Sequence, residues 1–427
     1  MKKIMQYTRE ELVKIEKELS TQYKHFVKAN LNLDLSRGKP ATSQLDLSNE
    51  LLDKLNSYLS DSGIDARNYG GLEGLPECRK LFAGLLDLDT EQIIIGGNSS
   101  LNMMYDNMAR LCLFGTRGEK PWKMYEHEGK RVKFLCPVPG YDRHFAICEK
   151  FGIEMVSVPL TGNGPEMNIV EKLVAEDSTV KGMWCVPLHS NPQGVCYSDE
   201  TVNRLASMKT AAKDFSIFWD NAYAIHHIYE EVSLRNVFDA AKEVGNENRI
   251  YYFFSTSKVS FPGAGVALIA SGLDNIAEIR ETMSVQTLGY DKINQLRHVQ
   301  KFETAQAVLD HMKLHAKDLE PKFSLTLHKL EAELKECGFA SWSSPRGGYF
   351  ISLYTFPGCA KDVFKLAEQV GVKLTKVGAT FPYGQDPEDS NIRIAPSYPS
   401  LKELDIAMDV LCLCVKLATV SKLLNRT

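Results

Sequence analysis

The ten cysteines of this sequence form no C-x-x-C pair and no zinc-finger spacing. Several of them, such as Cys136, Cys185 and Cys412, lie inside apolar runs, as buried reduced thiols do. No apolar stretch approaches the length that a bilayer requires, and the first twenty residues form a charged amphipathic pattern rather than an apolar signal core. We therefore expect a cytoplasmic protein that is not secreted, does not enter the membrane and binds no metal.

The sequence also lacks a strong charge of either sign. It has 50 basic and 54 acidic residues, a net charge of -4, and no internal repeat or low-complexity tract. This balance gives no argument for a nucleic-acid partner or an anionic membrane surface. A small-molecule partner is the expectation that follows.

Patterns typical of strands and helices alternate through the middle of the chain. An alternation of this kind predicts βαβ units and a mainly parallel sheet. The expected strands occupy residues 91–95, 132–138, 153–160, 181–188, 216–220 and 251–254. The fold class is therefore α/β, with a mainly parallel sheet sandwiched by helices and a smaller α+β domain.

At 427 residues the chain is too long for one ordinary core. We expect residues 1–50 to join the small domain, 51–300 to form the large α/β domain, and 301–427 to form the small C-terminal domain. Within these parts the periodicity predicts helices over 1–20 and 47–60, and one long bridging helix over 292–337. The last ninety residues mix strand and helix patterns, ending in an amphipathic helix.

An aromatic run that stops at Lys258 is the centre of the functional prediction. Tyr251 to Phe254 form a short apolar run expected for a strand buried on both faces, and small hydroxyl residues and the lysine follow at its end. Ligands sit at such strand ends in open α/β sheets, where a lysine can serve as a nucleophile or Schiff-base partner. Taken alone, a lysine is more often a solvated surface residue.

Three further strands end in complementary polar residues, in the sequences GGNSS, HSNPQG and DNAY. Asn98, Ser99 and Ser100 lie between a strand and a helix, where backbone N–H groups and the helix dipole favour a phosphate. Ser255 and Ser257 could add hydroxyl groups to the same phosphate. An ordinary helix cap is the alternative for the first three.

Asp220 closes a buried strand, where an isolated carboxylate is costly without a cationic partner. A protonated pyridine nitrogen is such a partner, and holding it charged keeps the ring a strong electron sink, as a pyridoxal enzyme requires. Asn191 and Tyr223 could then hydrogen-bond the ring hydroxyl. A helix cap, or a salt bridge with an arginine, is the other possibility for Asp220.

The motifs PGYDRHF, SNPQG, DNAY, STSK and NIRIAPS follow one another in this order. Together they resemble the class I, fold-type-I pyridoxal-phosphate aminotransferases. The segments NLDLSRGKP, RNYGGLEG and STSKVSFPGAGVA resemble, more narrowly, the aspartate aminotransferase subgroup Ic. The resemblance runs from about Leu33 to Ser397.

The resemblance implies pyridoxal 5′-phosphate as the cofactor, bound as a Schiff base to Lys258, which would also shuttle a proton. It places Tyr141 over the cofactor ring and Arg393 on the substrate α-carboxylate, a bidentate contact suited to arginine. Gly38 would let the backbone approach that carboxylate. Tyr69 would reach the phosphate of a neighbouring subunit, which implies a homodimer.

The sequence departs from the family pattern after the lysine. Many relatives have P-G-x-R there, with the arginine on the phosphate, whereas this chain has Pro-Gly-Ala-Gly at 262–265. No motif assigns an arginine to the side-chain carboxylate of a dicarboxylic substrate. Arg37, Arg143 and Arg297 are candidates for that role.

We therefore expect an aminotransferase that moves an amino group between an acidic amino acid, such as aspartate, and 2-oxoglutarate by a ping-pong mechanism. An aromatic or other aminotransferase, or a carbon-sulfur lyase, could use the same apparatus. A non-catalytic regulatory relative is the alternative from another class.

Overall fold

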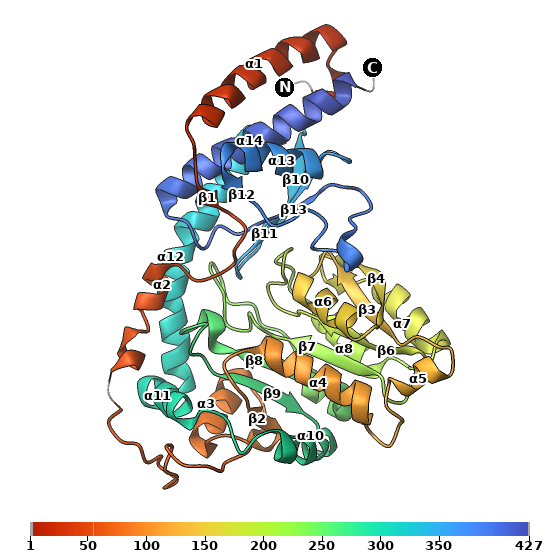
Figure 1. The fold of residues 1–427 in the computed structure, drawn as a ribbon, viewed down its shortest axis with the longest axis vertical. Helices are drawn as coiled ribbons and strands as arrows, with labels where there is room; N and C mark the ends of the chain where they lie inside the picture. The colour runs from red at the N-terminus through yellow and green to blue at the C-terminus, as the bar shows by residue number, and fades with distance from the viewer. Residues whose placement is uncertain (1–2, 54, 426–427) are drawn as a thin grey trace.

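The computed structural model describes residues 3–53 and 55–425, and its centre is an eight-stranded sheet in the order β2-β9-β8-β7-β6-β3-β4-β5 (Figure 1). Strands β8, β7, β6, β3 and β4 run parallel to one another. The prediction of a mainly parallel sheet is confirmed. The strands are β2 (Ile93–Ile95), β3 (Lys133–Val138), β4 (Glu154–Thr161), β5 (Gly164–Pro165), β6 (Val180–Cys185), β7 (Ser216–Asp220), β8 (Ile250–Ser255) and β9 (Ala267–Ser271).

Strand β9, which the periodicity did not predict, is antiparallel to both β8 and β2. Because two reversals restore the direction, β2 runs the same way as β8. The carboxyl ends of β2, β6, β7 and β8 therefore lie at one edge of the sheet, as expected for the four polar strand ends.

Helices cover both faces of this sheet, because its central strands are buried on both sides. Tyr251 and Phe253 face one core and Tyr252 and Phe254 the other, which is the alternation of a strand. The first core holds α4 (Ser100–Phe114), α6 (Asp142–Lys150) and α10 (Leu273–Gln286). The second holds α3 (Pro76–Leu86), α7 (Met167–Glu176), α8 (Asp199–Ser207), α9 (Val237–Lys242) and α11 (Lys292–Phe302).

A smaller α+β part is reached by the long helix α12 (Ala305–Leu330) and forms the upper half of Figure 1. It contains an antiparallel sheet in the order β10-β11-β13 and two large helices. Its elements are β10 (Ala340–Trp342), β11 (Ile351–Thr355), α13 (Ala360–Val370), β12 (Val372–Lys373), β13 (Asn391–Ile394) and α14 (Leu401–Leu424).

The beginning of the chain packs on this smaller part. Helix α1 (Arg9–Lys28) contacts α14, and β1 (Leu33–Asp34) pairs in parallel with β12. The N-terminal segment therefore lies beside the last quarter of the sequence. The domain boundaries near residues 50 and 300 stay predictions.

Three predicted helices differ from the structure. The first begins at Arg9, where Thr8 caps it by accepting from the Glu11 N–H. The prediction of a helix over 47–60 is wrong for the residues of this range that the structure describes, which do not include residue 54. Here α2 (Thr42–Asp46) and the short 3-10 turn Asn49–Leu52 precede an irregular chain, because side chains such as Ser57 bond the nearby backbone.

The long bridging helix is also interrupted. Glu303 has a φ of 53°, which ends α11, and the Thr304 hydroxyl caps the new helix α12 by accepting from the Ala307 N–H. A π-helical turn, Glu331–Lys335, follows α12. The bridge is therefore two helices with a bend rather than one rod.

All ten cysteines are free thiols. In residues 3–53 and 55–425 no helix has the length and apolarity needed to cross a membrane. The same part of the chain has no cluster of three or more His, Cys, Asp or Glu side chains suited to a metal ion. The short helix α5 (Met124–His127) completes the fold.

Candidate active site

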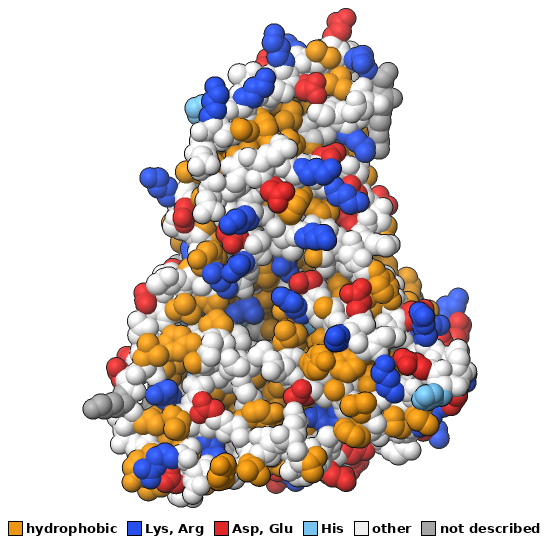
Figure 2. All heavy atoms as spheres, viewed as in Figure 1, with side chains coloured by type: hydrophobic (Ala, Val, Ile, Leu, Met, Phe, Trp, Pro, Cys, Tyr) orange, Lys and Arg blue, Asp and Glu red, His pale blue; other side chains and the backbone are white. Residues whose placement is uncertain are grey.

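Lys258 ends a 3-10 turn that follows directly on β8. Its Nζ lies 5.1 Å from the centre of the Tyr223 ring and 5.9 Å from that of Tyr349. Burial lowers the pKa of the amine, and the positive charge of Arg393 acts in the same direction while Asp220 opposes it. This lysine therefore loses its proton more readily than an exposed one. A space-filling view shows a hollow bordered by basic side chains where the two parts of the molecule meet (Figure 2).

Asp220 lies at the end of β7 and is only 3% exposed. Its Oδ2 is 2.9 Å from His144 Nε2, which can donate to it, and no arginine pairs with it among the described residues. The His144 ring stacks on Trp184 with 4.1 Å between ring centres. The other oxygen, Oδ1, is buried and has no hydrogen-bond partner in the described part of the chain. Asp220 therefore keeps one acceptor for a further donor.

The phenol groups of Tyr223 and Tyr141 both stay protonated at neutral pH. Burial raises the pKa of Tyr223 well above its usual value, and the nearby Tyr141 and Asp220 add to that rise. Burial likewise raises the pKa of Tyr141 to about 12. Tyr141 lies at the start of α6, with its ring edge-on to His144 at 5.0 Å. Both hydroxyl groups can therefore donate hydrogen bonds.

Arg393, on β13 of the smaller part, meets residues of the large sheet. Its Nη1 donates to Asn191 Oδ1 and to Asp142 Oδ1, each at 3.2 Å, and Nη2 donates to the Thr375 hydroxyl at 3.2 Å. The guanidinium is also 4.7 Å from the centre of the Phe350 ring. Its Nε is buried without a partner in the residues described. Three of the five guanidinium N–H groups are thus engaged, which holds the arginine in place and leaves the Nε–H and one Nη2–H for a further acceptor.

Gly38 lies directly against this aromatic ring. A Cβ atom at Gly38 would come within 2.1 Å of Phe350 Cζ, so no larger residue fits without moving the ring. Phe350 in turn faces Arg393. Close packing behind the arginine is thus one physical reason for the glycine.

The predicted phosphate residues meet at the edge of the sheet. The Ser255 hydroxyl donates to Ser257 Oγ at 3.0 Å, and Ser257 Oγ lies 3.5 Å from the Asn98 carbonyl. Helix α4 begins at Ser100, and the Ser99 side chain makes no capping bond. The hydroxyl of Ser99 and the first N–H groups of α4 are therefore available to an anion.

The loop without the family's arginine packs closely on these residues. The Asn98 amide donates to the carbonyls of Pro262 and Gly263, and the Asn294 amide to that of Gly265 at 2.6 Å. A Cβ atom at Gly265 would lie 2.8 Å from Thr256 Oγ1. The loop thus leaves no room at Gly265 for an arginine side chain.

The remaining predicted residues do not join this cluster within the chain. Tyr69 is 82% exposed and Arg143 is also exposed. The Arg37 side chain is exposed, with Asp34 at 3.7 Å. Arg297 is partly buried on α11, and its Nε lacks a partner within the described residues. The structure assigns none of the three arginines to the carboxylate of a substrate.

Sequence reasoning assigned no role to His144, Trp184, Thr375 or Phe350. A signal for His144 was present, because it lies three residues after Tyr141 at the start of a predicted helix. Its partner Asp220 is 76 residues away, and the pairing depends on the order of the strands.

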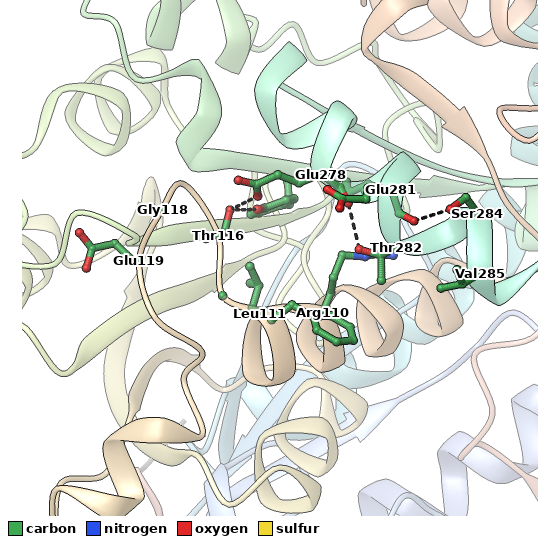
Figure 3. Close-up of a pocket in the computed structure, with 14 residues that line it drawn as sticks. Arg110, Leu111, Thr116, Gly118, Glu119, Glu278, Glu281, Thr282, Ser284 and Val285 are labelled. Atoms are coloured by element: carbon green, nitrogen blue, oxygen red, sulfur yellow. Dashed lines mark hydrogen bonds between the residues drawn. The ribbon is translucent and has the colours of Figure 1, made fainter.

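A separate pocket of about 630 Å³ opens between α4, α10 and the loop at 115–119 (Figure 3). Arg110 reaches it, donates from Nη1 to the Asn107 side chain and has no partner for Nε in the described chain. None of the predicted site residues lines this pocket.

Comparisons with known proteins agree with the fold and the cluster. The profile of the family described as aspartate amino-transferase matches residues 7–427. The chain belongs to this aspartate amino-transferase family. The aspartate aminotransferase of Corynebacterium glutamicum is 42% identical over 412 residues, which cover 96% of this chain and 94% of that protein. The crystal structure of an aspartate transaminase from the same species has a TM-score of 0.94 at 41% identity and covers 97% of this chain and 98% of its own.

This family member is an aminotransferase, and its cofactor is pyridoxal 5′-phosphate. The α-aminoadipate aminotransferase of Thermus thermophilus, solved with a phosphopyridoxyl-leucine, shares the fold at a TM-score of 0.74 and 19% identity, with coverage of 93% of this chain and 95% of that one. The residues present fit the cofactor. Asp220 has a buried oxygen without a partner among residues 3–53 and 55–425, Lys258 has a lowered pKa, and α4 begins beside three hydroxyl groups.

Proposed function

We propose that this aminotransferase moves an amino group between aspartate and 2-oxoglutarate by a ping-pong mechanism. The observation that supports the proposal is that Asp220 and Lys258 follow the carboxyl ends of the neighbouring strands β7 and β8, while Arg393 bonds Asn191 beyond the end of β6. The choice of aspartate rests on the name of the relative from Corynebacterium glutamicum.

We assign the cofactor to the predicted residues. Lys258 would hold it covalently, Asp220 would face the ring nitrogen, and Asn191 and Tyr223 the ring oxygen. Tyr141 would lie over the ring. The phosphate would be held by Asn98, Ser99, Ser100, Ser255 and Ser257. When bound, this group supplies an aldehyde for amines and a ring that withdraws electrons from the amine-bearing carbon.

Lys258 is the proton carrier in this proposal. Because burial lowers its pKa, the Lys258 amine gives up its proton more readily than an exposed lysine, and once the substrate amine has displaced it from the cofactor it would take a proton from the substrate α-carbon and return it to the reacting partner. Tyr223, whose phenol stays protonated, can donate a hydrogen bond but cannot serve as the base.

Arg393 would bind the substrate α-carboxylate. Three hydrogen bonds already fix its guanidinium, so little side-chain entropy is lost when a carboxylate arrives. Gly38 would keep the backbone of residues 37–39 close to that carboxylate, with Phe350 packed behind it. For the side-chain carboxylate of aspartate, Arg37, Arg143 and Arg297 stay candidates.

We also propose a homodimer in which Tyr69 reaches the site of the partner. Tyr69, Val285 and Leu288 are exposed by 82%, 89% and 65%, and a backbone hydrogen bond brings the segments of Tyr69 and Leu288 together. The Gly70 N–H donates to the Leu288 carbonyl, and the Gln286 amide donates to Asp106 on α4. An apolar surface of this kind is usual for an interface between subunits. The ten free thiols fit a reducing, cytoplasmic location.

The test is a panel of amino donors with 2-oxoglutarate, in which the formation of oxo acid and glutamate is measured. Aspartate is expected to give the highest kcat/KM. A higher kcat/KM for an aromatic donor would overturn the substrate assignment. Lys258→Ala is expected to abolish turnover and leave the circular dichroism spectrum unchanged, whereas turnover at the wild-type rate would overturn the role of the lysine.

A further inference from the structure

A buried chain of polar side chains ends on the peptide that follows Lys258. Gln44 Nε2 of α2 lies 3.1 Å from His315 Nδ1, and His315 Nε2 lies 3.2 Å from His311 Nε2 on α12. His311 Nε2 is 2.9 Å from the Val259 carbonyl oxygen. Gln44, His315 and His311 are 0%, 1% and 7% exposed. These three side chains have no role in the proposed chemistry, yet the series that they form ends, through His311, on the residue that follows Lys258.

The orientation of the Gln44 amide decides where the His315 proton lies. Gln44 Oε1 accepts from the Ala41 N–H at 3.1 Å, so Nε2 must point to Tyr349 OH, at 2.9 Å, and to His315. An amide nitrogen only donates, so His315 Nδ1 must accept. Since a neutral imidazole carries one N–H, the proton of His315 is then on Nε2, facing His311.

At the other end of this series of side chains, the Val259 carbonyl requires a different placement of the ring protons. The Val259 carbonyl only accepts, so the 2.9 Å contact is a hydrogen bond only when His311 Nε2 carries its proton. Two N–H groups would then face each other between His311 and His315. Burial lowers the pKa of both rings, that of His315 to about 4, so both are neutral at pH 7. These side chains can therefore form the hydrogen bond from Gln44 to His315 or the one from His311 to the Val259 carbonyl, but not both at once.

The position of Ser48 indicates which of these two hydrogen bonds forms in this structure. Its hydroxyl is 3.5 Å from the Val259 carbonyl and 3.3 Å from His311 Nε2, so the carbonyl has a second, weaker donor. His315 Nδ1 has no donor other than Gln44 among the described residues. With Gln44 in place, His315 therefore donates to His311, and the Val259 carbonyl loses the N–H of His311 as a donor.

We propose that Gln44, His315 and His311 are positioning residues that link the placement of the N-terminal segment to the Lys258–Val259 peptide. When Gln44 moves away, the proton of His315 can move to Nδ1, and His311 Nε2–H then donates to the Val259 carbonyl. Each histidine keeps one proton throughout. The inference rests on the proposed role of Lys258 in the aminotransferase reaction.

The N-terminal segment is suited to report on the substrate. The Leu35 carbonyl accepts from the Ala395 N–H, and the Ser36 carbonyl from the hydroxyl of Thr375, which also bonds Arg393. The same segment continues through Gly38 to Gln44. A change at the carboxylate end of the site therefore has a direct path to the lysine peptide.

The experiment compares wild-type holoenzyme, Gln44→Leu and, as a matched control, Gln306→Leu, an exposed glutamine on α12. Nitrogen NMR of ¹⁵N-histidine-labelled protein reports which ring nitrogen carries each proton. In the wild type we expect the proton on Nε2 of His315 and on Nδ1 of His311. In Gln44→Leu both protons should exchange places, and the control should match the wild type.

Kinetics give the second measurement. Gln44→Leu is expected to lower kcat by roughly tenfold with little change in KM, since the lysine is displaced while Arg393 is untouched. Should Gln44→Leu fail to fold, Gln44→Glu serves instead, because a carboxylate accepts from His315 Nδ1–H and imposes the same exchange. Unchanged protons in the folded variant, or an unchanged kcat, would overturn the inference.

Borohydride reduction of each holoenzyme, followed by peptide mass spectrometry, separates the two claims. Cofactor fixed on Lys258 with unchanged histidine protons means that only the linkage is wrong. The absence of cofactor on Lys258 in the wild type means that the proposed function itself fails.

Discussion

His144 Nε2 lies 2.9 Å from Asp220 Oδ2, while Asp220 Oδ1 is buried and has no partner in the described residues. One oxygen of the carboxylate is thus fixed by an imidazole that is itself stacked on Trp184. The other oxygen is the acceptor that we assign to the cofactor nitrogen.

Asp220→Asn should lower kcat by about 100-fold, because a hydrogen bond to a charged group contributes about 1.5–3 kcal/mol. Steady-state kinetics and the rate of cofactor loss on dialysis would measure the effect. Asp239→Asn, an exposed position on α9, is the control. Turnover in Asp220→Asn equal to that of the control would contradict the assignment.

Arg393→Lys should raise KM for the amino donor and lower kcat/KM by about 100-fold, because an ammonium cannot reproduce the planar pair of hydrogen bonds. Initial rates with aspartate give the values. Arg143→Lys and Arg37→Lys, at exposed arginines, show whether either contributes to the same contact. If one of them loses more kcat/KM than Arg393→Lys, the α-carboxylate assignment is wrong.

Gly265→Ala should lower the free energy of unfolding by about 1–3 kcal/mol, because its Cβ would lie 2.8 Å from Thr256 Oγ1 and 2.9 Å from the Phe261 carbonyl. Gly263→Ala, two residues earlier in the same loop, meets nothing within 4 Å and should be nearly neutral. Thermal unfolding of the two variants is the comparison. Equal unfolding midpoints would contradict the prediction, because they would mean that the loop moves to accommodate the added Cβ atom.

Val285→Asp combined with Leu288→Asp should shift the protein toward monomer, because two carboxylates would be buried in the proposed interface. Analytical ultracentrifugation gives the association state. Leu314→Asp, at a 44% exposed leucine on α12, should leave it unchanged. A wild type that sediments as a monomer would refute the dimer.

The stability of the protein should fall as the pH falls from about 6.5 to about 4. Burial lowers the pKa of both His298 and His315 from 6.5 to about 4 in the folded state. The unfolded chain therefore binds more protons within this range, which costs on the order of 3 kcal/mol for each histidine at the acid end. Above pH 6.5 their contribution is constant.

Melting temperature measured against pH tests this. His298→Gln should have a shallower dependence than the wild type between pH 6.5 and 4, whereas exposed His25→Gln should follow the wild type. Parallel curves for all three proteins would exclude a contribution from His298.

The sheet could be predicted because its strands are local patterns. The run from Tyr251 to Phe254 is apolar on both faces, so it had to be an interior strand, and parallel strands place their polar ends at one edge. Strand β9 was not predicted, and its antiparallel direction could not be read from the sequence because it depends on the neighbouring strands. The break in the bridging helix at Glu303 was not predicted either, because the helical pattern of apolar residues continues across it and only the backbone changes direction there.

Pairings between distant residues could not be derived from the sequence. The contacts of Arg393 with Asn191 and Asp142 join positions 202 and 251 residues apart, and they depend on how the smaller part meets the sheet. The contacts that join His315 and His311 to Val259 could not be derived either, because in the sequence these histidines are two positions of a helix with no signal of a partner.

The pairing of β1 with β12 also bears on how the protein is made. The Thr375 hydroxyl bonds the Ser36 carbonyl across 339 residues of sequence, so the N-terminal segment has no partner until most of the chain has left the ribosome. The eight-stranded sheet, by contrast, is complete by Ser271. We expect the sheet to form during synthesis and the segment carrying Gly38 and Gln44 to dock last, so that a truncated product would have a core but no finished substrate site.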